Sequence, residues 1–398
     1  MGVPADEATV RERRKTGQSV AAARKARGFT QAELARKAVI SPHLLSSVEQ
    51  GRRSLTPEVR EAITGVIGPI PDEPGTRPAP EQFWPVLAVL SGLMDGYDLP
   101  ADPPAVPKPL QELRDLTQTA TTWRLASRYS QLAGLIPGLI SDLTTVALSA
   151  AGDEREQAFG LLALAWRSAD ALADKTGSHN LSGRATELVR WASARSGDPL
   201  LEQMAAYVRA ELFFNGEHAR TGLRVIDASV GTSPRGDSVA HLAAYGALCM
   251  RGAVLAARAG LREEAADRIA EARTIANRVP EAVYHGTAFG PGNVRIHELA
   301  LAVEASDAGK AVELAAGWQP PRVLPPERRS HFHIEAARAY CMAGQADRAV
   351  KELWNARAAA PQHTRCSTAV AEVVESLVQR SRTPSPHLRQ LARWTNVI

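Results

Sequence analysis

The sequence predicts an all-α protein: a small helix-turn-helix bundle at the N-terminus, followed by a long array of helical hairpins. From about residue 111 to the end, Ala- and Leu-rich amphipathic stretches alternate with short breaks at Gly, Asp or Pro. No segment shows the sustained alternation of apolar and polar residues that is typical of strands. Residues 17–67 alternate short helical patterns with turn signals, which predicts a separate small domain.

Length and composition favour a soluble protein of two or three domains. The chain has 398 residues, of which 44% are hydrophobic and 23% charged. No uninterrupted apolar run approaches the ~18 residues of a membrane helix, and the first residues lack the apolar core of a signal peptide. The three cysteines are widely spaced and form no CxxC pair, which argues against disulfides and zinc. We therefore expect a cytoplasmic protein without a membrane partner.

The positive charge is concentrated at the N-terminus. Residues 1–67 hold 12 Lys and Arg against 7 Asp and Glu, a surplus of five, whereas the whole chain carries +4. The remainder is therefore close to neutral. A compact basic segment on a near-neutral body indicates a module that faces phosphate groups. Within it, residues 1–16 are expected to be a flexible basic segment.

A proline-rich linker is predicted at residues 68–110. Proline lacks an amide donor and disfavours helix at the preceding residue, so both proline runs in this segment interrupt helical structure. Between them lies an apolar stretch at residues 81–97, which we expect to form a short docking helix.

The first two helices of the N-terminal domain follow from terminator and capping residues. A helix through residues 19–27 is expected to stop at Gly28, which readily adopts the left-handed conformation. Thr30 then caps a helix of two turns at residues 31–38, and Glu33 completes a capping box.

A tight turn at residues 39–40 separates this helix from a third one. Ser41 is the expected N-cap of that helix, with Pro42 at its first position. Gly51 ends it. Two short helices joined by such a turn make a helix-turn-helix unit, whose second helix enters the major groove of DNA.

In this pattern, residues 17–67 resemble the Cro/cI-like (XRE) helix-turn-helix family, through "RGFTQAELARKA", Ser41 and "LLSSVEQGRR". The resemblance implies double-stranded DNA as a partner. Proline cannot donate a hydrogen bond to a base, which leaves His43 and Ser46 as the better base readers. The residues that the resemblance places at DNA are Gln31, Ser41, Pro42, His43, Ser46, Arg52 and Arg53.

Three positions of the same segment invite separate predictions. Val39 stands where the family usually has Gly, and because valine disfavours positive φ we expect a slightly different turn. Glu49 is interpreted as a structural carboxylate rather than a reader of cytosine. For Arg24, phosphate contact and simple solvation remain open alternatives.

No catalytic site, metal site or cofactor is predicted. Ser41, His43 and Glu49 are the residue types of a catalytic triad, but all three lie on one short helix and have simpler roles there. Walker, HExxH, GxSxG and dinucleotide-binding motifs do not occur in the sequence. We therefore expect a protein that is not an enzyme.

The C-terminal region contains a recurring pattern of two helices joined by a tight turn. Residues 334–362 combine small residues on a first helix, Gly344 at the turn and small residues on a second helix, and in this they resemble tetratricopeptide repeats. The same register recurs, so five or six antiparallel helix pairs are expected to stack into a right-handed solenoid at residues 111–398. The recurring second-helix positions are Ala185, Thr221, Ala265, Ala311 and Ala349. The layout resembles XRE regulators with tetratricopeptide-like sensor domains from bacteria with GC-rich genomes.

A solenoid binds ligands on its concave face, which the first helix of each pair lines. Counting back from each turn gives a mixed set of charged, polar and aromatic side chains, suited to a peptide or a polar small molecule. The predicted ligand-binding residues are Arg167, Asp170, Tyr207, Phe213, Arg251, Asn293, His297 and Arg338.

These observations predict a ligand-responsive transcriptional regulator. Because one short recognition helix reads few base pairs, we expect a homodimer on an inverted-repeat operator, with the solenoid providing the dimer contacts. The alternative is a scaffold or adaptor whose solenoid recruits a protein partner, with DNA binding secondary or absent.

Overall fold

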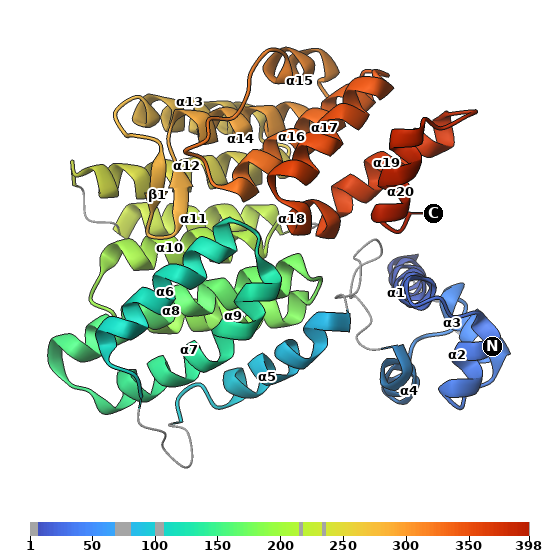
Figure 1. The fold of residues 1–398 in the computed structure, drawn as a ribbon, viewed down its shortest axis with the longest axis horizontal. Coiled ribbons are helices and arrows are strands. Elements are labelled where there is room, and N and C mark those ends of the chain that lie inside the picture. Colours follow the sequence, from blue (N-terminus) through green and yellow to red (C-terminus); the bar gives the residue numbers. More distant parts are fainter. Residues whose placement is uncertain (1–6, 68–80, 100–106, 215–217, 233–235, 398) are drawn as a thin grey trace. The chain divides into compact units, whose positions relative to one another are not determined.

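The computed structural model confirms the all-α class. In the described part of the chain there are twenty α-helices, one short 3-10 helix at Glu81–Phe83 and one two-stranded hairpin (Figure 1). The structure describes residues 7–67, 81–99, 107–214, 218–232 and 236–397. Residues 1–6, the proline-rich run at 68–80 and residues 100–106 of the second run predicted at 99–110 lie outside it.

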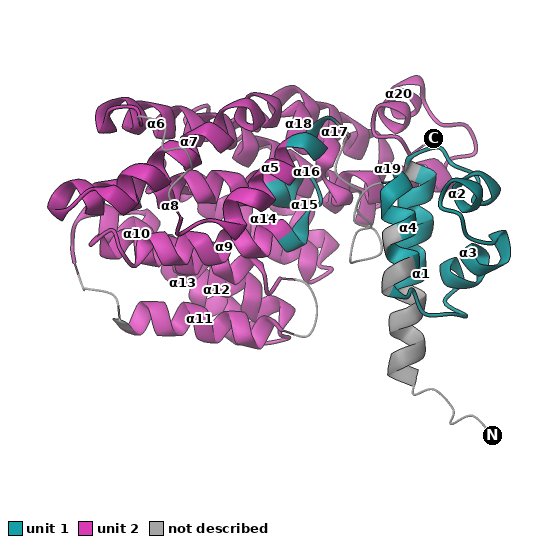
Figure 2. Cartoon of the chain, turned by 90° about the horizontal axis from the view of Figure 1, so that it is seen from below, with its two compact units in different colours: residues 1–85, 173–180 teal, residues 86–172, 181–398 magenta. Residues whose placement is uncertain are grey.

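The chain divides into two compact units. Residues 1–85 and 173–180 form one, called here the N-terminal unit, and residues 86–172 and 181–398 form the other, called the helical unit (Figure 2).

Four helices pack around one core in the N-terminal unit. This core contains Val20, Leu34, Leu45, Val48 and Ile63, all fully or almost fully buried. Because these residues come from all four helices, the small bundle is held by one shared apolar centre. The helices are α1 (Glu7–Ala26), α2 (Gln31–Lys37), α3 (Pro42–Glu49) and α4 (Pro57–Ile67).

Helix α1 is longer than the sequence analysis predicts. It begins at Glu7, whereas residues 1–16 were expected to be flexible. The physical reason is the composition of residues 7–16, which are rich in Glu, Arg and Lys and contain neither Pro nor Gly. A basic segment without helix breakers extends the helix that follows it.

Successive helices of the helical unit pack as antiparallel pairs (Figure 1). The expected second-helix residues 185, 221, 265, 311 and 349 lie on α9, α11, α13, α15 and α17, and all except Thr221 are buried. Gly260 and Gly344 follow α12 and α16 at φ 77° and 73°, the left-handed conformation that ends a helix. The helices up to α13 are α5 (Trp84–Asp95), α6 (Leu110–Leu125), α7 (Tyr129–Ser149), α8 (Gly152–Lys175), α9 (His179–Ser193), α10 (Pro199–Glu211), α11 (Ala219–Thr232), α12 (Val239–Arg258) and α13 (Arg262–Ala276).

The C-terminal part of this unit has its own large core, in which Phe332 meets Trp318 edge to face at 4.8 Å between ring centroids. Its helices are α14 (Pro291–Glu304), α15 (Ala308–Ala315), α16 (Pro326–Met342), α17 (Ala346–Ala359), α18 (Pro361–Cys366), α19 (Thr368–Arg380) and α20 (Pro386–Trp394).

Helix α5 is the short helix expected within the linker region. Its Leu87, Leu90 and Met94 side chains are buried. Arg184 of α9 donates hydrogen bonds to Ser91 and to Asp95 at its end. An apolar face with polar contacts at its edge holds α5 on the helical unit.

Helices α7 and α12 are long and apolar enough, by length and composition, to cross a membrane. Half of the most apolar window of α7 and 61% of that of α12 are buried inside the protein. Core helices of globular proteins have the same properties, and we interpret both as core helices.

A β-hairpin interrupts the helical unit between α13 and α14, where the sequence analysis predicts no strand. Its strands are β1 (Ala282–Tyr284) and β2 (Thr287–Phe289), with Val283 opposite Ala288. His285 and Gly286 connect them at φ 47° and 73°, the positive values of a tight type I′ turn.

The hairpin packs against α12 and α14 (Figure 1). Phe289 is fully buried, and a Cβ on Gly246 of α12 would lie 2.1 Å from its ring. The missing side chain at position 246 is therefore what admits the phenyl ring.

Candidate nucleic-acid interface

Helix α2 begins with the predicted capping box. The Thr30 hydroxyl accepts a hydrogen bond from the Glu33 amide at 3.2 Å, and the Glu33 carboxylate accepts one from the Thr30 amide at 2.8 Å. The Thr30 hydroxyl also donates to the Glu33 carboxylate at 2.8 Å, and the two hydrogen bonds that the carboxylate accepts from Thr30 hold the pKa of Glu33 below its ordinary value. Two backbone amides without partners in the helix are thus satisfied, which fixes where α2 starts.

The turn between α2 and α3 corrects the expectation for Val39. Valine adopts φ 54°, the left-handed conformation that glycine would take there. The amides of Val39 and Ile40 donate to the carbonyls of Arg36 and Ala35, the hydrogen-bond pattern of a Schellman motif. Val39 is 90% exposed, so no neighbour resists this conformation, and its cost is roughly 1–2 kcal/mol. The helix-ending motif determines the geometry despite the β-branched residue.

Helix α3 presents a polar first turn on one side and an apolar face on the other. The Ser41 hydroxyl accepts a hydrogen bond from the Leu44 amide at 3.1 Å, and Pro42 occupies the first helical position. Ser41, Pro42 and His43 are exposed, whereas Leu45 is fully buried in the core. The side chains predicted to read DNA therefore lie on the accessible face of this helix.

Ser46 and the two arginines after α3 complete the predicted set. Ser46 is half-buried, and its hydroxyl accepts a hydrogen bond from the Gln50 amide group at 3.3 Å. The Arg52 and Arg53 amides both donate to the Ser47 carbonyl, while their side chains are exposed. Their backbone is anchored to α3, and their charges are available to phosphate groups.

A buried ion pair connects α1 to α3. Arg24 donates to both carboxylate oxygens of Glu49, from Nε at 2.6 Å and from Nη2 at 2.9 Å, and Nη1 donates to the Phe29 carbonyl at 2.8 Å. Glu49 thus has the structural role that its position predicts. For Arg24 neither alternative is correct, because its guanidinium group is buried in this pair.

Gln31 also points to Glu49. Its side-chain amide donates to the Glu49 carboxylate at 2.6 Å and links α2 to the Arg24 pair. Gln31 is the first residue of α2, as predicted, but in this structure its side-chain amide binds a buried carboxylate of the domain. A buried carboxylate requires hydrogen-bond donors, and the sequence does not show that Gln31 lies close enough to Glu49 to be one of them.

Gly17 is a structural residue that the sequence analysis misses. A Cβ at this position would lie 2.2 Å from the Val48 carbonyl oxygen and 2.8 Å from that of Glu49. Only glycine lets α1 approach the end of α3 this closely. A glycine inside a helical pattern is the signal that points to such an approach.

Comparison with known proteins agrees with this geometry. Residues 20–69 match the family model described as Helix-turn-helix. These residues form a helix-turn-helix DNA-binding domain. No curated protein and no solved structure matches the chain. The helix-turn-helix domain, called the HTH domain below, makes the chain a DNA-binding regulator.

Outside the HTH domain, most of the predicted ligand-binding residues are buried and bonded to the chain itself. Arg251 lies over the Tyr207 ring at 3.9 Å and pairs with Glu211 at 2.8 Å, and Arg167 lies 5.8 Å from the same ring. Asp170 accepts a hydrogen bond from Ser182 at 2.6 Å. Arg167, Tyr207 and Arg251 are therefore brought together.

Two further members of the set, Asn293 and His297, meet on α14. Asn293 donates to the Ala288 carbonyl at 2.7 Å, and Arg328 donates to its side-chain oxygen at 2.9 Å. The His297 Nδ1 atom lies 3.0 Å from the Asn293 carbonyl oxygen. Burial, together with the charge of Arg328, lowers the pKa of His297 to about 3.

The last two members are more accessible. Arg338 donates to Glu335 at 2.9 Å, and Phe213 is half-buried just after α10.

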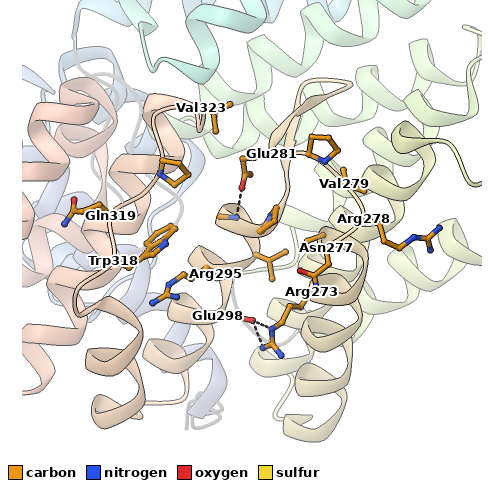
Figure 3. A pocket seen from close by; sticks show the side chains of 16 residues that line it. Arg273, Asn277, Arg278, Val279, Glu281, Arg295, Glu298, Trp318, Gln319 and Val323 are labelled. Carbon is orange, nitrogen blue, oxygen red and sulfur yellow. Dashed lines mark hydrogen bonds and ion pairs between the residues drawn. The ribbon is translucent and has the colours of Figure 1, made fainter.

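A surface cavity of about 990 Å³ lies at the base of the hairpin, and none of the eight predicted residues lines it. Figure 3 shows the Arg273–Glu298 ion pair on the wall of this cavity, and it shows Trp318 and Arg295 elsewhere on the same wall. Arg295 lies 5.1 Å from the Trp318 ring. The Glu281 carboxylate accepts a hydrogen bond from the Gly292 amide at the start of α14. The cavity is lined by residues that precede β1 and by residues that follow β2. Helix register alone does not predict that these two segments lie together.

Proposed function

We propose that this chain is a sequence-specific transcriptional regulator that acts in the cytoplasm as a homodimer on an inverted-repeat operator. The observation that carries the proposal is the exposed first turn of α3, with His43 free of the apolar core on which Leu45 and Val48 hold the helix. A rigid helix with an accessible polar turn is what insertion into the major groove requires. Two such helices double the number of bases that are read.

We further propose that the helical unit is a tetratricopeptide-like sensor of a small molecule or peptide. Its helix pairs and its inward-facing Arg, Asn and His side chains support this assignment. A ligand would act by binding one dimer geometry better than another, since only differential affinity shifts an equilibrium.

A pair of substitutions tests the DNA contacts in the full chain. His43→Ala should lower the preference for the operator over an unrelated duplex, by about 1–3 kcal/mol if His43 reads a base. Arg53→Ala should weaken binding to every duplex alike and reduce the slope of log affinity against log salt by about 0.9. Titrations of fluorescent duplexes at several salt concentrations measure both quantities.

Lys351→Ala is the matched control, since it removes one exposed positive charge from the helical unit. It should change neither quantity. Equal effects of the His43 and Arg53 substitutions on all duplexes would refute their separate roles. If the unaltered chain enriches no genomic sequence, the adaptor alternative, in which the helical unit recruits a protein, takes the place of this proposal.

A further inference from the structure

Two buried arginines of the helical unit hold the tip of the hairpin. Arg124, at the end of α6, donates to the Gly286 carbonyl at 2.7 Å, and Arg167 of α8 donates to the His285 carbonyl at 2.9 Å. The two side chains are only 9% and 6% exposed. Consecutive carbonyl oxygens of one tight turn thus face two guanidinium groups.

Within the described part of the chain, neither of these two guanidinium groups has an anionic partner. Each donates only to a backbone carbonyl, and no carboxylate lies at ion-pair distance from either. The Nε atom of Arg124 is buried without any hydrogen-bond acceptor. A buried charge ordinarily requires a partner of opposite sign, so this arrangement is costly for a purely structural site.

The electrostatics of the pair support this view. Burial lowers the pKa of Arg124, and burial with the charge of Arg124 lowers the pKa of Arg167 to about 9. The acidic groups whose charge acts on Arg124 are Glu327, Asp170 and Glu211. Each has another partner: Glu327 lies 3.9 Å from Arg328 and from His363, Asp170 accepts from Ser182, and Glu211 pairs with Arg251. The two arginines therefore share an excess of positive charge.

Only the tip of the hairpin is weakly held, because all three residues of β2 behind it are buried. The two strands have three residues each, and the turn places His285 at φ 47°, a value that non-glycine residues rarely adopt. Among the residues that the structure describes, the side-chain ion contact of the tip is the one between the His285 ring and the Asp198 carboxylate, at 3.3 Å. Carbonyl oxygens bind guanidinium groups less strongly than charged oxygens do.

We propose that Arg124 and Arg167 form an oxyanion site, which binds a carboxylate or phosphate group of the signal molecule in place of the two hairpin-tip carbonyls. In this structure the chain's own turn occupies the site. The proposal rests on the proposed sensor function of the helical unit, and it names the chemical group that is sensed and the element that the group displaces.

Anion binding to the full chain tests the site directly. The melting temperature is measured against increasing sodium phosphate or sodium acetate, with sodium chloride keeping the ionic strength constant. We expect a saturating rise with at least one of the two anions, and the more effective anion distinguishes phosphate from carboxylate recognition. No rise above the chloride control with either anion would overturn the proposal.

Arg167→Met and Arg124→Met remove one guanidinium group each, and Arg190→Met, at an exposed arginine paired with Glu187, is the control. The two site variants should need at least about tenfold more anion for half the maximal rise, because a charged hydrogen bond is lost. The control should not differ from the unaltered chain. An equal rise in all variants would contradict the assignment.

Gly286→Ala tests the competition without removing an arginine. In the docked hairpin an added Cβ would lie 2.9 Å from Arg124 Nη2, at a φ of 73° that alanine disfavours. Because only the docked hairpin is penalised, anion affinity should rise about fivefold. Gly246→Ala, which expels the Phe289 ring, should act in the same direction. Unchanged or weaker anion binding in both variants would refute displacement of the hairpin.

Binding of an operator duplex is measured on the same preparations without added anion. Failure of anion binding with intact DNA binding would reject the oxyanion site alone, whereas loss of specific DNA binding with intact anion binding would reject the proposed regulator function alone.

Discussion

At the scale of single residues, the Glu49 carboxylate joins three helices of the HTH domain. It accepts hydrogen bonds from Arg24 of α1 and Gln31 of α2 while it belongs to α3 itself. Arg24 and Glu49 are buried, whereas His43 on the same helix as Glu49 is exposed. The position of the recognition helix therefore depends on a buried ionic contact as well as on the apolar core.

Arg24→Met should destabilise the HTH domain by roughly 3 kcal/mol, because Glu49 would remain buried without its cation. Hydrogen exchange of the α3 amides in the full chain measures the loss. Arg36→Met, at an exposed arginine of α2, is the matched control and should leave exchange nearly unchanged. Equal protection in the two variants would show that the ion pair contributes little.

His297 gives a pH dependence to the helical unit. Its pKa is about 3 in the folded chain, against 6.5 for an unperturbed histidine. Because the pKa is lower in the folded state, the contribution of neutral His297 to the free energy of unfolding is fully present above pH 6.5. It is lost as the pH falls toward 3, at about 1.4 kcal/mol per pH unit. Denaturant unfolding followed by tryptophan fluorescence should show this loss.

His297→Gln provides the comparison, because glutamine does not titrate. The variant should lose less stability than the unaltered chain between pH 6.5 and pH 4.5. Parallel curves for the two chains over this range would contradict a buried neutral imidazole.

Single residues also mark a limit of what the sequence predicts. Capping by Thr30 and Ser41 could be predicted, because a cap depends on residues at most three positions away. The partner of Arg24 lies 25 residues away and that of Arg167 lies 118 away. Residue type and helix register predict that such a side chain faces inward, but they do not predict which residue is its hydrogen-bond partner.

At the scale of elements, close contact between α1 and α3 depends on Gly17. Gly17→Ala should destabilise the HTH domain by about 1–2 kcal/mol, since overlap with the Val48 carbonyl outweighs the better helix propensity of alanine. Hydrogen exchange of the α1 and α3 amides in the full chain measures the change.

Gly65→Ala is the control for that prediction, because a Cβ at Gly65 of α4 would meet nothing within 4 Å. It should be neutral or stabilise the domain by up to about 1 kcal/mol. If both substitutions shift stability in the same direction, helix propensity rather than close packing determines the effect.

The hairpin shows which element the sequence does not easily reveal. Residues 282–289 read Ala-Val-Tyr-His-Gly-Thr-Ala-Phe, and a Gly in a two-residue turn between β-branched and aromatic residues is a hairpin signal. Three-residue strands give too little alternation to stand out among long amphipathic helices. The helices themselves were predictable, because their period repeats over several turns.

At the scale of the whole molecule, the proposed homodimer predicts how the operator is bound. Two chains should occupy one inverted repeat, and a duplex with a single half-site should bind at least about tenfold more weakly, because half of the base contacts are lost. Analytical ultracentrifugation of the chain with each duplex measures the stoichiometry. One chain per full operator, with equal affinity for the half-site, would contradict the dimer.

The contact between Gly246 and Phe289 has a consequence for how this protein can change in evolution. The phenyl ring occupies the volume that a side chain on α12 would need, so the two positions share one space. Neither residue can be exchanged freely while the other is kept. In homologous chains we therefore expect these positions to covary, with any residue larger than glycine at 246 accompanied by a smaller side chain at 289.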